Sequence, residues 1–329
     1  KLKTIFAEPF MINDIKMTVQ TSVGIVIIEP KDSNVEEIIR HADIAMYQAK
    51  KNRHNHISYY DIELDNERKK LFTLQHDLVF AAENRQLELY LQPIVSIDND
   101  HLIAAECLIR WEHPKFGLLS PQDFIPTATE TGAISDITWW VLEEICKNIY
   151  RLKEKKVWRL SYISINIDAK QLLINHFVDK FLETLSQYHI KTGEIMIEIT
   201  EQSLIDNFEG TQDIISVLKA HGINCAIDDF GIGYSSLSYL KKLSFDTLKI
   251  DREFIKDIQQ RPDDITLIKT MLTIGREFNY NIVIEGIEDN VQKETLAKID
   301  PKLTYQGFLF EKPIAFEAFI KKYVRAEPL

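Results

Sequence analysis

The stretch NCAIDDFGIGYSSLSYLKKLSFDTLKID, residues 224–251, places two short apolar runs on either side of a glycine turn and a helical segment. The first run ends near Asp228 and Asp229, and the second ends near Lys249 and Asp251. A strand, a crossover segment and a second strand form the unit from which parallel sheets are built. The stretch therefore predicts two parallel strands with charged side chains at their carboxyl ends.

The same alternation of short apolar runs and longer amphipathic segments extends through the rest of the chain from about residue 87. Eight strands with helices between them, over roughly 240 residues, match a (β/α)8 barrel of the TIM type. The predicted strands cover residues 87–95, 102–111, 160–167, 195–200, 224–230, 247–251, 281–287 and 305–310. The predicted fold class is α/β, with an open doubly wound sheet as the alternative. No GxGxxG motif follows any of these strands, which disfavours a dinucleotide cofactor.

Residues 1–61 carry a different pattern, with a strand at 17–28, an amphipathic helix at 35–51 and a strand at 56–61. Three elements bury too little surface to form a domain, so we expect this α+β segment to be a fragment of a larger one. A charged helical stretch at 62–86 would link it to the barrel domain at 87–329.

The composition limits the classes of partner. Hydrophobic residues make up 45% of the chain, enough for a sizeable core. The formal net charge of −11 argues against binding long nucleic acids, because phosphate backbones require an excess of lysine and arginine. There is no apolar run long enough to span a membrane, no secretory leader, and no disulfide framework among the three cysteines. These features favour the cytoplasm, although segments outside this chain could tether a longer parent to a membrane.

Polar side chains follow the predicted strands at the ends where a parallel barrel builds its active sites. Seven successive strands end in residues that can bind metal, bind phosphate or transfer protons: Glu106, Asn166, Glu198, Asp228 with Asp229, Lys249 with Asp251, Glu285, and Gln306. Because these strand ends converge on one face, we expect the side chains to share one cup. Crowded carboxylates raise each other's pKa, and bound cations would relieve their repulsion.

This set of donors favours hard divalent cations. Carboxylates and one amide oxygen, without histidine or thiolate, favour Mg²⁺ or Mn²⁺ over zinc. The adjacent Asp228 and Asp229 could serve two ions, which indicates phosphoester hydrolysis by a metal-activated water. Lys249 would act electrostatically on the water or the leaving oxygen, since a base would need a depressed pKa. Arg110, four residues beyond Glu106 on the same side of its strand, can bind a phosphate through two hydrogen bonds.

Eight motifs in a fixed order make the pattern specific. Residues from about 70 to 325 contain LQPIV, AAECLIRW, SINI, EITE, DDFGIGYSSL, LKID, IEGIE and YQGF. Through these motifs the chain resembles the EAL family of cyclic di-GMP phosphodiesterases. The resemblance implies a barrel whose first strand runs antiparallel to the others. It also implies hydrolysis of cyclic di-GMP to linear pGpG, and a homodimer formed through the barrel beside the loop in the 230s.

The resemblance also implies a role for each matching residue. One metal ion would be held by Glu106, Asn166, Glu198 and Asp228, and the second by Asp228, Asp229 and Glu285. The catalytic residues would be Lys249, which contacts the catalytic water, together with Glu285 and Glu106. The substrate would be bound by Gln92, Leu108, Arg110, Asp251, Glu288 and Gln306. The loop at 230–236 would be anchored by Glu201 of the EITE motif.

Three positions depart from the family's usual residues. Cys107 replaces the usual alanine in the signature tripeptide, Ile232 stands where threonine is common, and Ile284 where alanine is common. Ile232 lies in the glycine turn that is expected to tune metal occupancy, so it bears on turnover more than on ligand binding. All the direct metal-ligand positions of the family are present.

Residues 1 to about 60 resemble the carboxyl-terminal third of a GGDEF domain through SVGIVI, HADIAMYQAKK and ISYYD. That family's signature loop is not among these residues, so we do not expect diguanylate cyclase activity from them. Two rival functions stay open for the barrel. One is a non-catalytic cyclic di-GMP receptor that signals through the helix at 62–86, and the other is an enzyme acting on a different phosphoester. The retained metal ligands favour the phosphodiesterase.

Overall fold

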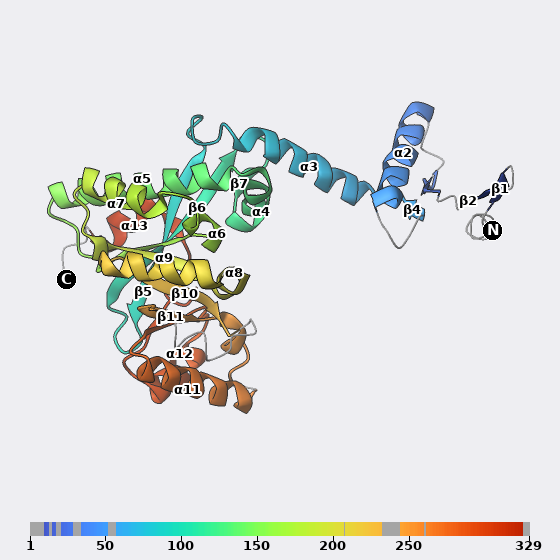
Figure 1. Cartoon of the computed structure of the whole chain (residues 1–329). Coiled ribbons are helices and arrows are strands. Elements are labelled where there is room, and N and C mark those ends of the chain that lie inside the picture. The colour runs from blue at the N-terminus through green and yellow to red at the C-terminus, as the bar shows by residue number, and fades with distance from the viewer. Residues whose placement is uncertain are drawn as a thin grey trace. The chain divides into compact units, whose positions relative to one another are not determined.

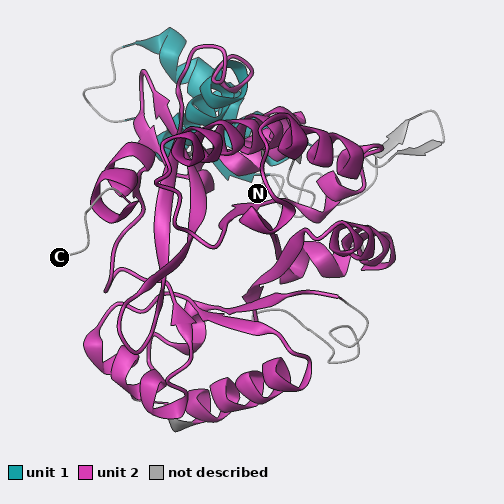
Figure 2. Cartoon of the chain, turned by 90° about the vertical axis from the view of Figure 1, so that its left-hand side faces the viewer, with its two compact units in different colours: residues 1–77 teal, residues 78–329 magenta. Residues whose placement is uncertain are grey.

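The computed structural model describes residues 10–12, 15–17, 21–28, 34–51, 57–206, 208–231, 244–259 and 261–324. The chain divides into two compact units, residues 1–77 and 78–329 (Figure 2). Among the described residues, no helix combines the length and the hydropathy that crossing a bilayer requires.

The first unit packs a helix against a short sheet. Its strands are β1 (Phe10–Ile12), β2 (Ile15–Met17), β3 (Val23–Ile25) and β4 (Ile57–Tyr59), and its helices are α2 (Val35–Lys51) and α3 (Ile62–Leu78). β1 pairs antiparallel with β2, and β3 pairs parallel with β4. Gly24 lets α2 approach β3, because a Cβ at this position would lie 2.1 Å from the Ala42 carbonyl oxygen.

Two expectations for this unit are corrected. The single strand expected at 17–28 is divided, with β2 ending at Met17 and β3 covering only Val23–Ile25. The helix expected at 62–86 ends at Leu78, and turns occupy residues 79–85. Arg85 adopts a left-handed conformation with φ 56°, which a continuing α-helix does not allow.

The second unit is a closed eight-stranded barrel (Figure 1). Its strands are β5 (Leu87–Ser96), β6 (Leu102–His113), β8 (Ile163–Asn166), β9 (Ile195–Thr200), β10 (Asn224–Phe230), β11 (Thr247–Ile250), β12 (Asn281–Ile284) and β13 (Thr304–Tyr305). Neighbours from β6 through β8 to β13 run parallel. β5 closes the ring by pairing antiparallel with both β6 and β13. The barrel and its antiparallel first strand are thus confirmed, and the open-sheet alternative is wrong.

Helices surround the barrel on its outside (Figure 1). The longer ones are α4 (Pro121–Thr131), α5 (Ile134–Glu154), α7 (Phe177–Gln187), α9 (Phe208–Ala220), α11 (Pro262–Glu277) and α12 (Asn290–Ile299). The shorter ones are α6 (Ala169–Leu172), α8 (Glu201–Asp206), α13 (Phe316–Phe319) and single turns at Thr192–Glu194, Arg252–Phe254 and Ile320–Val324. Two short strands, β7 (Gly117–Leu119) and β14 (Ile314–Ala315), extend the sheet.

Successive side chains of each strand point alternately outward to the hydrophobic core and inward to the barrel interior. Outward residues such as Ile163, Ile165 and Ile197 join the large core beneath the helices. The inward neighbours include Ser164 and Glu198, because successive side chains of a strand point to opposite faces. Hydrophobic packing therefore holds the strands from outside and leaves their inner ends available for polar groups.

Candidate active site

The strand register brings the predicted polar residues to one level of the barrel. Asn166 of β8 is directly opposite Glu198 of β9, and Glu106 of β6 is directly opposite Gln92 of β5. Asp228 lies two residues beyond Ala226, the partner of Glu198 in β10. The carboxyl ends of separate strands therefore supply one cluster of side chains.

Lys249 is the centre of this cluster. Its side chain is 1% exposed, and its Nζ lies 2.8 Å from Glu198 Oε2, Asp228 Oδ1 and Glu285 Oε1. Glu106 Oε2 is slightly farther, at 3.4 Å. An ammonium group has three N–H donors and cannot bond four oxygens at once. Asp228 Oδ1, although close, has no hydrogen-bond partner among the described residues. We call these five residues the Lys249 cluster.

Amide side chains complete the partners of Glu106. Asn166 Nδ2 donates to Glu106 Oε1 at 2.7 Å, and Gln306 Nε2 donates to Glu106 Oε2 at 2.6 Å. Gln306 Nε2 also reaches Glu285 Oε1 at 3.1 Å. Burial favours the neutral acid, but the Lys249 charge and these donors outweigh it and lower the pKa of Glu106.

Glu198, Glu285 and Asp229 have raised pKa values. Burial raises the pKa of Glu198 to about 8, with Glu106 and Asp228 adding to the effect and Lys249 opposing it. Burial likewise holds the pKa of Glu285 well above its usual range. Burial and the Asp228 charge raise the pKa of Asp229 to about 6. The single positive charge of Lys249 cannot balance the five carboxylates of Glu106, Glu198, Asp228, Asp229 and Glu285 if all of them are ionised.

Two groups of carboxylates in the cluster suit divalent cations. Ligand oxygens of Glu106, Glu198 and Asp228 lie within 4.8 Å of one another, as do those of Asp228, Asp229 and Glu285. Asp228 belongs to both groups, and its buried Oδ1, which lies 2.8 Å from Lys249 Nζ, accepts no hydrogen bond from the described residues. All the donors are oxygens, the type that Mg²⁺ and Mn²⁺ prefer. The residues present therefore fit a pair of hard cations.

The remaining predicted substrate residues make separate contacts. Gln92 is buried and donates to the Glu311 carbonyl at 3.3 Å. The Arg110 guanidinium lies 5.3 Å from the centre of the Tyr90 ring and donates to the Ile109 carbonyl at 2.9 Å.

Asp251 lies near Asp229 and helps to raise its pKa, whereas Glu288 lies at the surface. Asp251 accepts from the Glu253 N–H at 2.7 Å and so caps the following turn, and the Glu288 side chain is exposed. Within the described ranges, neither of them, nor Gln92 or Arg110, has an ion pair or hydrogen bond to Lys249.

Glu201 meets the start of the glycine turn. Its buried Oε2 accepts from the Gly231 N–H at 2.7 Å. Gly231 has φ 104°, and a Cβ there would lie 2.6 Å from the Phe254 ring, so glycine is required. The prediction for Ile232 lies outside the described residues, as do all residues from 232 to 243.

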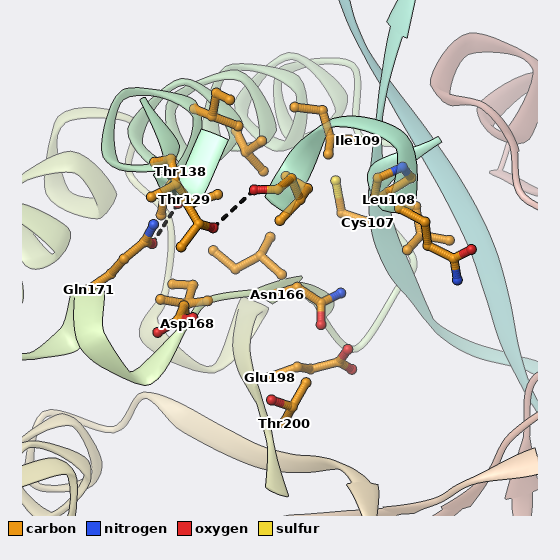
Figure 3. Close-up of a pocket in the computed structure, with 18 of the residues that line it drawn as sticks. Cys107, Leu108, Ile109, Thr129, Thr138, Asn166, Asp168, Gln171, Glu198 and Thr200 are labelled. Atoms are coloured by element: carbon orange, nitrogen blue, oxygen red, sulfur yellow. Dashed lines mark hydrogen bonds between the residues drawn. The ribbon is translucent and has the colours of Figure 1, made fainter. Parts of the chain in front are cut away.

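A cavity of about 400 Å³ beside the cluster was not predicted from the sequence. Asn166 and Glu198 line it together with helices α4 and α5, and Leu108 lies at its edge (Figure 3). Besides Glu198, Thr138 and Gln171 are buried polar residues in this mostly apolar lining. The only sequence signal for them was a polar residue on an otherwise apolar helix face.

Two family models match the chain. Residues 73–313 match the EAL domain, and residues 1–56 match the diguanylate cyclase, GGDEF domain. The resemblances inferred from the motifs are thereby confirmed.

Curated relatives match over nearly the whole chain. The bifunctional diguanylate cyclase/cyclic di-GMP phosphodiesterase MucR of Pseudomonas aeruginosa is 34% identical over 322 residues, which are 97% of this chain and 46% of MucR. The cyclic di-GMP phosphodiesterase PdeR of Escherichia coli is 32% identical over 322 residues, which are 96% of this chain and 48% of PdeR. The chain thus spans about half the length of these relatives.

Solved structures share the barrel. The PaMucR phosphodiesterase in complex with c-di-GMP aligns with a TM-score of 0.71 and 37% identity, over 75% of this chain and 99% of that one. An EAL domain protein from Listeria monocytogenes aligns with a TM-score of 0.66 and 27% identity, over 75% and 96% of the two chains.

Proposed function

The chain belongs to the EAL domain family, and from this premise we propose that it hydrolyses one phosphodiester bond of cyclic di-GMP and releases linear pGpG. The observation that carries the proposal is the Lys249 cluster, in which acids from separate strands meet around one buried ammonium. The names of the relatives MucR and PdeR support the choice of substrate.

We propose that two divalent cations, Mg²⁺ or Mn²⁺, are required. The first would be held by Glu106, Asn166, Glu198 and Asp228, and the second by Asp228, Asp229 and Glu285. Five of these ligands are carboxylates and Lys249 supplies one positive charge, so the ionised site has a net charge of −4, which two divalent cations neutralise. Bound there, the cations would activate a water and polarise a phosphoryl oxygen.

Lys249 acts as a fixed cation in this proposal. The surrounding acids outweigh the effect of burial and hold its pKa well above the usual range, so it does not accept a proton at neutral pH. Its ammonium keeps Glu106 and Glu285 in position through ion pairs, and its charge would orient the attacking water. Gln306 restrains the same two acids through its amide. Lys249, Glu106 and Glu285 are therefore the proposed catalytic residues.

Substrate binding is assigned to residues around the cluster. Arg110 can donate two hydrogen bonds to the phosphate that is not cleaved, but it must first leave the Ile109 carbonyl. The other proposed contacts are Gln92, Leu108, Asp251, Glu288 and Gln306. Glu201 would set the position of the 230–236 loop through its hydrogen bond to Gly231.

Three further features belong to the proposal. The domains are a GGDEF-like fragment at 1–61, a linker at 62–86 whose helix ends at Leu78, and the phosphodiesterase domain at 87–329. The barrel forms a homodimer beside the loop in the 230s, which light scattering at micromolar concentration would test. The enzyme acts in the cytoplasm, where it meets cyclic di-GMP.

The decisive experiment is incubation with cyclic di-GMP and Mg²⁺ or Mn²⁺, followed by chromatographic detection of pGpG. We expect turnover that EDTA abolishes and that Glu106→Gln reduces by at least about a thousandfold, because the variant removes a proposed ligand. Glu112→Gln, on the same strand but exposed, is the matched control and should keep full activity. A folded protein that binds the nucleotide without producing pGpG would instead be a receptor.

A further inference from the structure

Asp246 directly precedes β11, at the end of the barrel opposite to the Lys249 cluster. Its N–H donates to the carbonyl of Cys225 in β10 at 2.9 Å, and its carbonyl accepts from the Asn281 N–H of β12 at 2.9 Å. β10 and β11 are neighbours in the barrel (Figure 1), and β12 follows β11. The three strands lead to three members of the cluster, which are Asp228, Lys249 and Glu285. Asp246 therefore joins these strands where they begin.

The side chain of Asp246 adds a second bond to β10. Its Oδ2 accepts from the Cys225 N–H at 3.0 Å, so Asp246 and Cys225 exchange two hydrogen bonds. In a longer parallel ladder this N–H would bond to a carbonyl of the neighbouring strand. β11 begins only at Thr247, so the carboxylate takes the place of that carbonyl. Lys219 of α9 holds the other oxygen, with its Nζ 3.0 Å from Asp246 Oδ1.

The ladder between β10 and β11 is regular only near Asp246. The second pair beyond Asp246 joins Ile227 to Leu248, and after it the register shifts. Asp228 and Asp229 lie within this shift, and Asp229 has a left-handed φ of 53°. Within the described strands, no ladder pair holds Asp228 to β11, so its position against this strand depends on the contacts that precede it.

We propose that Asp246 is a positioning residue for the hydrolysis, because it sets the register of β10 against β11 and so keeps Asp228 Oδ1 at 2.8 Å from Lys249 Nζ. This inference rests on the proposed function. Asp246 acts through the two strands, since among the described residues its side chain has hydrogen bonds and ion pairs only to Cys225 and Lys219. A displacement of about 1 Å at a reaction centre can cost on the order of 100-fold in rate.

Two conservative variants separate positioning from charge pairing. Asp246→Asn keeps an oxygen that can accept from the Cys225 N–H but loses the ion pair with Lys219. Asp246→Glu keeps the charge that attracts Lys219, but its extra methylene moves the carboxylate away from Cys225. We expect Asp246→Asn to keep kcat within about threefold and Asp246→Glu to lose about tenfold. The reverse order would show that Asp246 serves only its ion pair and would overturn the inference.

Asp246→Leu removes both contacts and gives the largest expected effect. Its kcat should fall about 30-fold while KM stays within about twofold, because the substrate contacts lie elsewhere. Calorimetric titration with Mn²⁺ gives a measurement that needs no substrate. Asp246→Leu and Asp246→Glu should bind Mn²⁺ about tenfold more weakly than the unmodified chain, and Asp246→Asn should bind it equally well. If Asp246→Leu does not fold, the asparagine and glutamate variants carry the test.

Glu194→Leu is the matched control for lost stability. Glu194 also accepts a backbone N–H, from Lys191 at 2.8 Å, and forms an ion pair with Lys153. These contacts cap the turn before β9 and do not join two strands of the barrel. Glu194→Leu should lower the melting temperature as Asp246→Leu does, but it should keep kcat and the affinity for Mn²⁺.

The outcomes separate this inference from the proposed function. Turnover of cyclic di-GMP that is the same in all three Asp246 variants would overturn the inference and leave the phosphodiesterase intact. Weaker Mn²⁺ binding in the glutamate and leucine variants alone, in a folded protein that releases no pGpG, would support the positioning role and refute the proposed hydrolysis.

Discussion

In the absence of divalent ions, the barrel should become less stable as the pH rises from 5.5 to 8.5. The folded-state pKa of Glu198 is raised to about 8 from an ordinary 4.5, and those of Glu285 and Asp229 are raised too. A raised folded-state pKa gives stability that is complete below the unfolded value and is lost as the pH rises through the folded value. The other two shifted groups of the cluster do not titrate in this window. The pKa of Glu106 is lowered and that of Lys249 is raised, so their contributions to stability change only at lower and at higher pH.

The magnitude follows from Glu198, which is almost fully buried. The part of this shift that lies inside the window, from pH 5.5 to about 8, corresponds at about 1.36 kcal/mol per pKa unit to roughly 3 kcal/mol. For a domain of this size, 1 kcal/mol shifts the melting temperature by about 2 to 4 °C. We therefore expect a fall on the order of 10 °C across the window.

Thermal melts followed by circular dichroism at pH 5.5, 7.0 and 8.5, in EDTA and in Mn²⁺, measure this effect. Mn²⁺ should stabilise the protein most at pH 8.5, since the ligands must be deprotonated to bind it. Glu198→Gln should flatten the slope in EDTA, and the exposed Glu183→Gln should not. A melting temperature in EDTA that stays level or increases toward pH 8.5 would refute the electrostatic account of the cluster.

Three other substitutions test single contacts. Lys249→Met should lower the stability in EDTA by about 3 to 5 kcal/mol and reduce turnover below one per cent, because it leaves buried acids without their cation; urea titration and pGpG release measure the two effects. Glu201→Leu removes the acceptor for the Gly231 N–H and should lower kcat at least about tenfold with little change in KM. Gln86→Leu removes the acceptor of the Trp111 indole N–H, 3.0 Å away, and should cost about 1 kcal/mol in urea while turnover is kept.

The barrel was predictable because its eight strands are short apolar runs at regular spacing. The antiparallel direction of β5 was not contained in that periodicity and came from the family resemblance alone. The lengths of strands were also overestimated. The strand predicted at 305–310 is observed as β13, which covers only Thr304–Tyr305. Beyond it the backbone of Gly307 packs on Ile287, where a Cβ would lie 2.0 Å from the Ile287 oxygen. The apolar side chains there continue into a turn, which composition cannot distinguish from a strand.

The cluster could be predicted as a set but not in its internal connections. Residues at the ends of parallel strands must converge, so Glu106, Glu198 and Asp228 were expected to be neighbours. The sequence could not show that Lys249 contacts all of them, because that depends on the register between strands and on the direction of each side chain. The burial of Gln171 could not be predicted, because it depends on how α5 packs over α6, where Thr138 meets this amide. The catalytic and binding roles themselves stay predictions until they are measured.

Asp228 should matter more for metal binding than its neighbour Asp229. Asp228 belongs to both carboxylate groups, whereas Asp229 belongs to one. Asp228 Oδ1 is in ion-pair contact with Lys249 but accepts no hydrogen bond from the described residues, so a cation can bind this oxygen without breaking a hydrogen bond. In calorimetric titrations with Mn²⁺, Asp229→Asn should keep one ion per chain, and Asp228→Asn should weaken both sites by on the order of 100-fold. Equal stoichiometry in the two variants would show that no shared carboxylate joins the two sites.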